Sequence, residues 1–308
     1  MKEHYMIRRG IIFMSLIVLC GCRADPVNEW DYLDNGILRI GVDRSRGACI
    51  GFFGESETQR NLLNHYDEGR FIQQSYYGKE DGSDWDGKPW VYNPIQGGSW
   101  QGVPAKVSAF KKTYTKLFAR IVPRHWANGE LCPEMTMEET IILDGELAKI
   151  SFYMKYEGED QGKPRHQEMP AVFIDGALEN FFYTKDGVLT NQEPRILAEN
   201  NKAGADGLGL GSSSSEWVAY LDEDKWGVGI YTPGTSEFTV YRALGDGNTG
   251  EQGSACSYVA PLRTFALKKG MELRYEVYLT IGTLKEIEDR FEILKADLAR
   301  LQSPAQLP

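Results

Sequence analysis

The chain has 308 residues, of which 34 are Lys or Arg and 44 are Asp or Glu, so its formal net charge at pH 7 is −10. An acidic surface of this kind repels phosphate backbones, which disfavours nucleic acid as a partner but does not exclude a neutral or basic glycan. The 33 glycines and the 12% of aromatic residues suit a sheet protein with many tight turns, and the length suits one or two domains.

The N-terminus has the order of a bacterial secretion signal. Lys2, Arg8 and Arg9 form a basic flank, residues 11–19 form a short apolar run, and Leu-Cys-Gly-Cys follows, ending at Cys22. The apolar run is shorter than the roughly 20 residues that span a bilayer, which favours a cleaved signal. The last four residues resemble a lipobox. This implies cleavage after residue 21, lipidation of Cys22, and a membrane-anchored protein of the cell envelope, in the outer membrane or facing the periplasm. The alternatives are an ordinary signal peptide and an uncleaved anchor.

Three cysteines follow the predicted signal, at Cys49, Cys132 and Cys256. They are far apart and form no Cys-x-x-Cys pair, so no zinc cluster is predicted. One disulfide would leave a thiol unpaired, and the simpler interpretation is that all three are core positions.

A tether at residues 22–29 precedes a predicted β-rich domain at residues 30–282. The clearest hairpin joins residues 135–143 to residues 148–156, because both segments alternate with a period of two and Asp144-Gly145 suits the turn between them. Further strands are predicted at residues 216–221, 226–231, 237–242 and 272–281. No repeat of about 20–50 residues is present, which disfavours a propeller or solenoid. The expected fold is all-β, a large two-sheet sandwich.

Residues 184–215 are irregular and rich in Gly, Asn and Ser. A long irregular stretch in a compact domain is often a functional loop at the mouth of a site, and surface decoration is the alternative.

The C-terminus changes from a period of two to a helical period. Leu284, Ile287, Phe291, Leu294, Leu298 and Leu301 recur at steps of three and four residues. Thr283 and Glu286 fit a capping box, so a helix is predicted at residues 283–302. Its single apolar stripe is expected to pack on the outside of the sheets, with partner binding as the alternative.

Polar and aromatic side chains are densest between residues 61 and 100. Sugars present apolar C–H faces, on which aromatic rings stack, and hydroxyls, which Arg, Asn and Gln can bind. The candidate sugar-binding residues are Arg70, Gln73, Tyr76, Tyr77, Asn93, Gln96 and, further along, Trp217. If residues 70–77 form a strand, Gln74 and Tyr76 share one face and Gln73, Ser75 and Tyr77 share the other. The alternative is a polar-aromatic sheet edge that only packs.

The same stretch carries a family resemblance. Residues 64–78 and the later run Asn93-Pro-Ile-Gln-Gly-Gly98 resemble uncharacterised secreted bacterial lipoproteins. The Asn-bearing turn followed by Asp67-x-Gly69-Arg70 is similar to galactose-mutarotase-like domains. That resemblance implies a β-supersandwich over most of residues 30–282. Such domains occur in aldose 1-epimerases and within many glycosidases and polysaccharide lyases.

His166 and Glu168 are the candidate catalytic pair. In an extended segment they point the same way, about 7 Å apart along the strand, and a His and a carboxylate on one face can serve as acid and base. Aldose epimerases resemble this in chemistry, because a His donates to the ring oxygen and a Glu takes the proton of the anomeric hydroxyl. Their His and Glu lie far apart in sequence, so this pair does not match their motif. His65 and His125 are further candidates.

Other carboxylates also come into consideration. Ordinary glycosidase chemistry needs two acids, and the candidates are Glu134, Glu138, Glu139 and Glu216, for which a solvated face is the simpler interpretation. Asp84 and Asp86 lie on a glycine-containing turn that could hold calcium, although the glutamate that completes an EF-hand loop is missing. A plain acidic turn is the alternative there, and no other cofactor is predicted.

The sequence therefore predicts a carbohydrate-active envelope lipoprotein. The expected reactions are glycan cleavage, by hydrolysis or lyase elimination, and sugar epimerisation, with His166 and Glu168 transferring protons. A non-catalytic glycan-binding lipoprotein is the main alternative, and a structural envelope protein with no ligand is a third.

Overall fold

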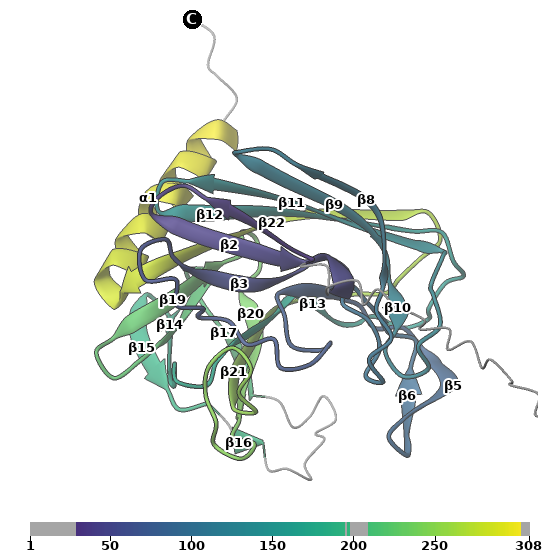
Figure 1. Ribbon diagram of the computed structural model, residues 1–308. Coiled ribbons are helices and arrows are strands. Elements are labelled where there is room, and N and C mark those ends of the chain that lie inside the picture. Colours follow the sequence, from purple (N-terminus) through teal and green to yellow (C-terminus); the bar gives the residue numbers. More distant parts are fainter. Residues whose placement is uncertain (1–28, 195, 198–208, 303–308) are drawn as a thin grey trace, which may run out of the picture.

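The computed structural model describes residues 29–194, 196–197 and 209–302. Within these ranges the chain forms antiparallel β-sheets and one C-terminal α-helix (Figure 1). This confirms the predicted all-β sandwich with a C-terminal helix. The predicted lipidation site, Cys22, lies outside the described residues.

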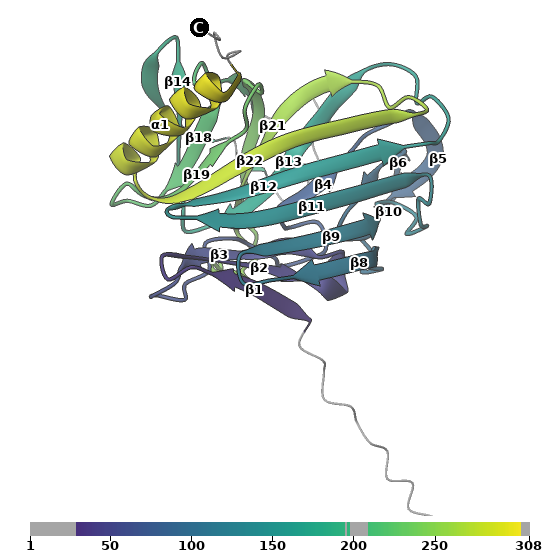
Figure 2. The same cartoon turned by 90° about the horizontal axis from the view of Figure 1, so that it is seen from above.

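One layer of the sandwich is a nine-stranded antiparallel sheet. Its spatial order is β15 (Val188–Gln192), β14 (Asn180–Lys185), β18 (Trp217–Leu221), β19 (Trp226–Tyr231), β22 (Met271–Thr283), β12 (Leu147–Tyr156), β11 (Met135–Asp144), β9 (Lys116–Val122) and β8 (Lys106–Lys112). The strand β22 lies between two groups of strands that precede it in the chain (Figure 2).

The second layer contains an eight-stranded sheet. Its order is β10 (Arg124–His125), β7 (Pro94–Ile95), β4 (Gln73–Ser75), β13 (Arg165–Asp175), β21 (Cys256–Phe265), β20 (Glu237–Ala243) and β16 (Ile196–Leu197), with β17 (Gly209–Ser212) also paired to β20. The pairing of β16 with β20 is parallel, and the other pairings in this sheet are antiparallel. A separate two-stranded hairpin, β5 (Glu80–Trp85) and β6 (Lys88–Val91), projects beside β10 (Figure 1).

A three-stranded sheet continues the second layer. It consists of β1 (Trp30–Asp34), β2 (Leu38–Asp43) and β3 (Cys49–Glu55), with a short 3₁₀ turn at Arg44–Arg46. A bridge between Ile50 and Ile72 joins β3 to the segment that leads into β4. The main core lies between the layers, since Ile40 from this sheet, Ile150 from the nine-stranded sheet and Val259 from the eight-stranded sheet belong to one buried cluster.

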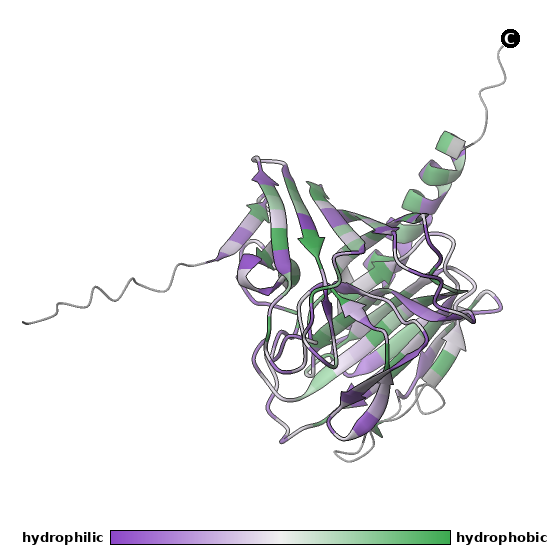
Figure 3. Cartoon of the chain, turned by 90° about the vertical axis from the view of Figure 1, so that its right-hand side faces the viewer, coloured by the Kyte–Doolittle hydropathy of each residue, from purple (hydrophilic) through white to green (hydrophobic). Residues whose placement is uncertain are grey.

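Alternation of apolar and polar residues explains why the strands bury one face (Figure 3). In β11 the residues Met135, Met137, Glu139 and Ile141 are buried, and the residues between them are partly exposed. The predicted hairpin of β11 with β12 is confirmed, with Asp144 paired to Leu147 across the turn. Gly145 has a φ of +54°, a conformation that glycine adopts without strain. The strands predicted at residues 216–221, 226–231, 237–242 and 272–281 are also present, as β18, β19, β20 and β22.

The helix α1 (Leu284–Gln302) packs on the outer face of the nine-stranded sheet, as predicted (Figure 2). The capping box is formed, since the Glu286 Oε2 atom accepts a hydrogen bond from the Thr283 amide at 2.8 Å. Ile287 and Phe291 are buried against β19 at Gly229, where an added Cβ would lie 2.4 Å from the Ile287 Cγ2 atom. The predicted stripe ends before Leu301, which is exposed.

Two further predictions concern the cysteines and residues 184–215. Cys49, Cys132 and Cys256 are buried free thiols, which agrees with their interpretation as core residues. In the described part of residues 184–215, the short strands β15, β16 and β17 interrupt the stretch that the sequence predicted to be irregular. Within the described chain, no helix combines the length and apolarity needed to cross a membrane.

Candidate active site

The outer face of the eight-stranded sheet carries the candidate site. Val172, Ile174 and Val259 point into the main core, so the side chains that alternate with them point away from it. A small separate apolar cluster forms on that outer face, with Ala171, Tyr258, Ala260 and Leu262 as its buried members. The register pairs Glu168 with both Ser75 and Leu262, which places these three residues in one row across β4, β13 and β21.

Glu168 is the centre of this face. Its side chain is half-buried, and its Oε1 atom accepts a hydrogen bond from the Tyr258 hydroxyl. The hydroxyls of Ser75 and Tyr77 also hydrogen-bond to the Glu168 carboxylate. The small side chain of Ala260 lies between Tyr258 and Leu262 on the same face, which leaves room for the Tyr258 ring to extend along the sheet toward Glu168.

Burial and hydrogen bonding act on the Glu168 carboxyl in opposite directions. Burial raises its pKa, and the hydrogen bonds from Tyr258, Ser75 and Tyr77 partly oppose that increase, with a net rise. Burial and the nearby Glu168 charge raise the pKa values of Tyr77 and Tyr258 well above the usual tyrosine range. The tyrosines therefore remain protonated donors, while the carboxyl titrates closer to neutral pH than an exposed glutamate does.

Aromatic rings and an arginine extend the face away from Glu168. The ring of Tyr241 stacks on that of Tyr258, with a centroid distance of 4.3 Å and an interplanar angle of 26°. Phe173 packs on the other neighbouring strand, with its ring centroid 4.7 Å from that of Tyr258. The positive charge of Arg70 acts on the Tyr241 hydroxyl, so this guanidinium lies near the tyrosine row.

Arg70 is held in place by its own loop and by a neighbouring one. Its Nη1 atom donates to the Ser254 carbonyl at 2.7 Å, and its Nε atom lies 3.4 Å from the Asp67 carboxylate. Its guanidinium also lies 5.0 Å from the centre of the Tyr66 ring. Burial raises the pKa of Asp67, and the Arg70 charge opposes that increase. The site thus has a carboxyl at one end and a fixed cation at the other.

His166 lies on the same outer face as Glu168. Both belong to β13, where His166 pairs with Thr264 and Glu168 pairs with Leu262. His166 is exposed, and its Nδ1 atom lies 3.0 Å from the Thr264 hydroxyl oxygen. The structure therefore brings together Glu168, His166, Tyr77 and Arg70 of the predicted site residues, and catalysis by His166 stays a prediction.

Comparison with solved structures identifies the fold. A galactose mutarotase-like protein from Lactobacillus casei ATCC 334 is similar over 82% of this chain and 99% of its own, with a TM-score of 0.50 and 13% identity. A galactose mutarotase related enzyme from Lactobacillus acidophilus is similar over 82% of this chain and 97% of its own, with a TM-score of 0.48 and 12% identity. No family model matches the sequence, and no curated protein is significantly similar to it.

The fold is galactose-mutarotase-like. The predicted fold resemblance is thereby confirmed. At such low identity, the similarity establishes the architecture and leaves activity to be argued from the side chains.

Within this galactose-mutarotase-like fold, five predicted sugar-binding residues do not reach the surface. Their side chains are at most 1% exposed: Gln73, Tyr76, Asn93, Gln96 and Trp217. They are buried because their polar atoms serve the protein itself or because they fill a core, so they support the site or the fold instead of contacting a ligand. Trp217 packs under α1, on the opposite sheet.

The buried amides show what these residues do instead. Gln73 donates to the Gly69 carbonyl at 2.8 Å and accepts from the Gly97 amide at 2.8 Å. Asn93 donates to the Tyr76 carbonyl at 2.8 Å. The Gln73 bonds connect the loop before β4 to the loop after β7, and the Asn93 bond connects the segment after β4 to the segment before β7. Together they hold the backbone that positions Arg70 and Tyr77.

The other predicted histidines are engaged elsewhere. The Nε2 atom of His125 lies 2.8 Å from the Asp81 carboxylate, and its Nδ1 atom accepts from the Ala127 amide at 3.1 Å. His65 is buried, lies 3.6 Å from Glu251, and has its pKa lowered mainly by burial. Both histidines have structural partners in these positions.

The other predicted carboxylates do not gather at the Glu168 face. Glu134 accepts from the Tyr92 hydroxyl at 2.6 Å, Glu138 pairs with Arg120 at 2.6 Å, and Glu216 accepts from the Gly234 amide at 3.0 Å. Glu139 is fully buried between the layers.

The acidic turn that contains Asp84 and Asp86 has the geometry of an ordinary hairpin turn. The Asp84 Oδ1 atom accepts from the Gly87 amide at 2.7 Å, and Asp86 and Gly87 have φ values of +53° and +77°. This is the tight turn between β5 and β6. Across the described ranges, no group of three or more His, Cys, Asp or Glu residues is placed to hold a metal ion, and calcium binding at Asp84 and Asp86 stays a prediction.

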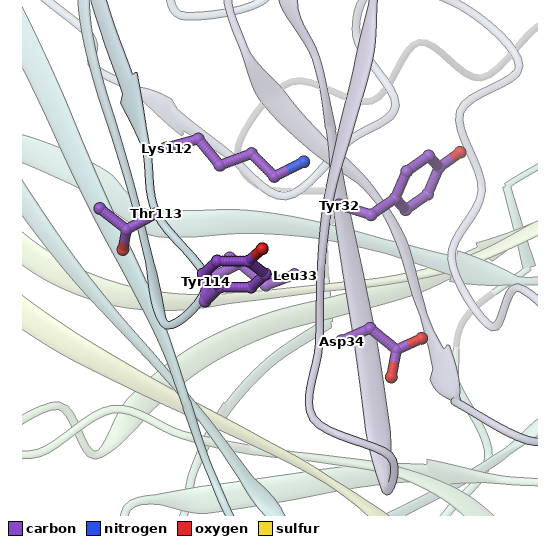
Figure 4. Close-up of a pocket in the computed structure, with 6 residues that line it drawn as sticks. All are labelled: Tyr32, Leu33, Asp34, Lys112, Thr113 and Tyr114. Atoms are coloured by element: carbon purple, nitrogen blue, oxygen red, sulfur yellow. The ribbon is translucent and has the colours of Figure 1, made fainter.

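A separate cavity of about 490 Å³ lies between β1 and the turn after β8 (Figure 4). Its lining residues are Tyr32, Leu33, Asp34, Lys112, Thr113 and Tyr114. These residues do not include those around Glu168, so the cavity is not part of the site described above.

Sequence reasoning missed three aromatic members of the site, Phe173, Tyr241 and Tyr258. They lie about a hundred residues or more after Arg70, and only strand pairing brings them to Glu168. A local signal was present, because Tyr258, Ala260 and Leu262 alternate with Val259 and Pro261. That pattern predicts one aromatic and two aliphatic side chains on a single strand face.

Proposed function

We propose that this protein binds a carbohydrate on the Glu168 face and that Glu168 transfers a proton in a reaction of the bound sugar. The observation that carries the proposal is a half-buried carboxyl that receives hydrogen bonds from Tyr258, Tyr77 and Ser75 and has a raised pKa. A carboxyl of this kind can both donate and accept a proton near neutral pH.

The groups around Glu168 match the chemistry of a sugar. The partly exposed rings of Tyr77 and Tyr241 offer apolar surfaces for C–H faces. Arg70 and the tyrosine hydroxyls can hydrogen-bond to sugar hydroxyls or to a ring oxygen. The fixed guanidinium and the carboxyl would orient the ligand between them.

His166 is the leading partner of Glu168 in proton transfer. The two side chains project from one face of β13, and His166 is exposed to solvent. A histidine and a carboxyl that act on opposite ends of a hemiacetal would support ring opening and epimerisation. The same pair could protonate a leaving group and remove a proton in glycan cleavage.

A two-carboxylate hydrolysis is the second candidate, and the strand register favours it. Glu237 on β20 pairs with Leu262 on β21. Leu262 in turn pairs with Glu168 on β13, so both acids lie in one row. Two strand spacings separate their backbones by roughly 10 Å. Inverting glycosidases place their two carboxyl groups about 6.5–9.5 Å apart, which the two side chains could reach.

A product assay separates these possibilities. Purified protein would be incubated with mono- and oligosaccharides, with products followed by chromatography and anomer ratios by NMR. Loss of turnover in Glu168→Gln is expected in either mechanism. Loss in His166→Ala with Glu237→Gln active supports the His–Glu pair, and the reverse pattern supports hydrolysis by two acids. Sugar binding without any product would instead make this a glycan-binding protein, and full turnover in Glu168→Gln would overturn the proposal.

We also propose export and lipid anchoring at Cys22, on the basis of the N-terminal sequence. The protein would then act at the envelope with the membrane as its partner through the lipid. The variant Cys22→Ser should move the protein from the membrane fraction to the soluble fraction. Unchanged membrane association of that variant would contradict the anchor.

A further inference from the structure

Three tryptophans form a cluster next to the loop that carries Arg70. Trp85 on β5 contacts Trp90 on β6 with a ring-centroid distance of 4.6 Å and an interplanar angle of 70°. Trp85 also contacts Trp126, just after β10, at 5.8 Å and 70°. All three side chains are partly exposed. We call this group the tryptophan cluster.

Gly69 connects the tryptophan cluster to the site. A Cβ atom added at Gly69 would lie 2.8 Å from the Cη2 atom of Trp126. The indole therefore packs directly against the backbone of the residue that precedes Arg70. The aromatic surface and the fixed guanidinium are thus neighbours on one rim.

The strand register gives the span between the cluster and Glu168. Arg124 pairs with Ile95, Ile95 with Ser75, and Ser75 with Glu168, so the row crosses four adjacent strands. Three spacings of about 4.8 Å make roughly 14 Å between the two outer backbones. Trp126 follows β10 directly. One sugar ring at Glu168 would not cover this span, whereas a chain of several linked sugars would.

The tryptophan cluster is held firmly by polar contacts beneath it. The hydrogen bond of His125 with Asp81 ties β10 to β5 at 2.8 Å. The Trp90 indole donates to the Asn93 side chain at 3.2 Å, and the Trp100 indole donates to the Ala127 carbonyl at 2.9 Å. A pre-ordered aromatic surface loses little conformational freedom when it binds a ligand.

The charges around the cluster indicate what kind of chain it would accept. Glu80, Asp84 and Asp86 expose carboxylates on the same hairpin and outnumber its exposed cation, Lys88. These charges would repel a polyanion. A neutral glycan escapes that repulsion and still presents C–H faces for indole stacking.

We propose that the tryptophan cluster is a distal subsite for a neutral oligosaccharide whose other end occupies the Glu168 site. This inference rests on the proposed function and adds the substrate class, a neutral chain of several sugar units in place of a free monosaccharide. The indole faces of Trp126 and Trp90 hold the distal units, and Arg70 directly follows the glycine against which Trp126 packs.

Affinity as a function of chain length tests the inference. Neutral gluco-, xylo- and manno-oligosaccharides of one to six units would be titrated by calorimetry, with oligogalacturonate as the anionic comparison. Affinity should rise with chain length for a neutral series. Trp126→Ala should lower affinity for the longest member by about tenfold and leave monosaccharide affinity unchanged.

Two further variants keep the result interpretable. Trp90→Ala probes the same surface without touching Gly69, in case Trp126→Ala unfolds, and the melting temperature of each variant is recorded. Tyr153→Ala removes a partly exposed aromatic ring from the outer face of the nine-stranded sheet and should change nothing. Binding that is independent of length and unaffected by either tryptophan variant would overturn the subsite but leave the proposed function standing. No binding by any sugar would overturn both.

Discussion

Two glutamates with raised pKa values lie in different regions of this molecule, and the contrast between them separates burial from function. Glu139 on β11 points into the core between the layers, where burial raises its pKa to about 8. Its Oε2 atom accepts from the Gln96 amide at 3.0 Å, and its Oε1 atom has no hydrogen-bond partner in the described structure. Glu168 has the same kind of shift, but its side chain is half-buried on an outer face.

The difference lies in access and in the number of donors. Glu168 receives three hydroxyl hydrogen bonds and lies on an outer face beside the partly exposed ring of Tyr77, so its carboxyl is partly open to solvent. No ligand can reach Glu139, whose proton affects only the stability of the fold. A raised pKa therefore marks a candidate site only together with an open face and convergent donors.

Glu168→Gln should have the largest effect on activity. Turnover of any sugar that the protein converts should fall about a thousandfold, because the amide cannot exchange a proton. The free energy of unfolding should change little, since Tyr258 can still donate to the amide oxygen. The matched variant Glu139→Gln should retain turnover. Equal losses in both variants would contradict a catalytic role that Glu168 has and Glu139 lacks.

Glu139→Gln should change the pH dependence of stability. The pKa of Glu139 in the folded protein, about 8, lies above its ordinary value of 4.5. Its contribution is therefore fully present below pH 4.5 and is lost as the pH rises through 8. Denaturant unfolding should show the wild-type free energy of unfolding falling by on the order of 5 kcal/mol across that range, and the variant should lack this decline. A decline of the same size in the variant would assign it to other groups.

Tyr258→Phe tests how the hydroxyl donors around Glu168 affect its pKa. Loss of this hydrogen bond removes stabilisation of the charged carboxylate, so the pKa of Glu168 should rise further. The corresponding limb of the pH–rate profile should move to higher pH. Tyr156→Phe is the control, because that hydroxyl donates to the Glu159 carbonyl at 2.7 Å, away from Glu168. A downward shift in Tyr258→Phe would contradict the assignment.

His166→Ala should lower turnover less than Glu168→Gln does. The exposed imidazole contacts Thr264 and keeps its solvent shell, so its loss should lower turnover by about a hundredfold, at the low end for a general acid or base. Steady-state turnover measures this directly. A loss as large as that of Glu168→Gln would make His166 an equal partner, and no loss at all would remove it from the mechanism.

The sequence was sufficient to predict six of the strands, β11, β12, β18, β19, β20 and β22, but not the face of the site. Hairpins such as β11–β12 are local, and their alternation is visible over ten residues. Before β4 the alternation of buried and exposed residues does not hold, because Phe71 and Ile72 are both fully buried. Ile72 packs in the main core, and Phe71 packs against the buried His65 ring. Both sides of this segment therefore carry an apolar side chain.

The buried amides account for three of the five predicted sugar-binding residues that lie inside the protein. Gln73, Asn93 and Gln96 have the side chains that bind sugars, but here they bind backbone groups. Local sequence does not distinguish an amide that faces a ligand from one that faces a carbonyl. The decision depends on loops that meet only after folding, as does the arrival of Tyr241 and Tyr258 beside Glu168.

The position of β22 has a consequence for how the chain is made. This last strand pairs with β12 on one side and β19 on the other, so it joins two half-sheets that are synthesised before it. Until it emerges from the ribosome, both halves keep an unpaired edge and the sandwich cannot close. A chain whose central strand comes last therefore completes this sheet only near the end of its synthesis.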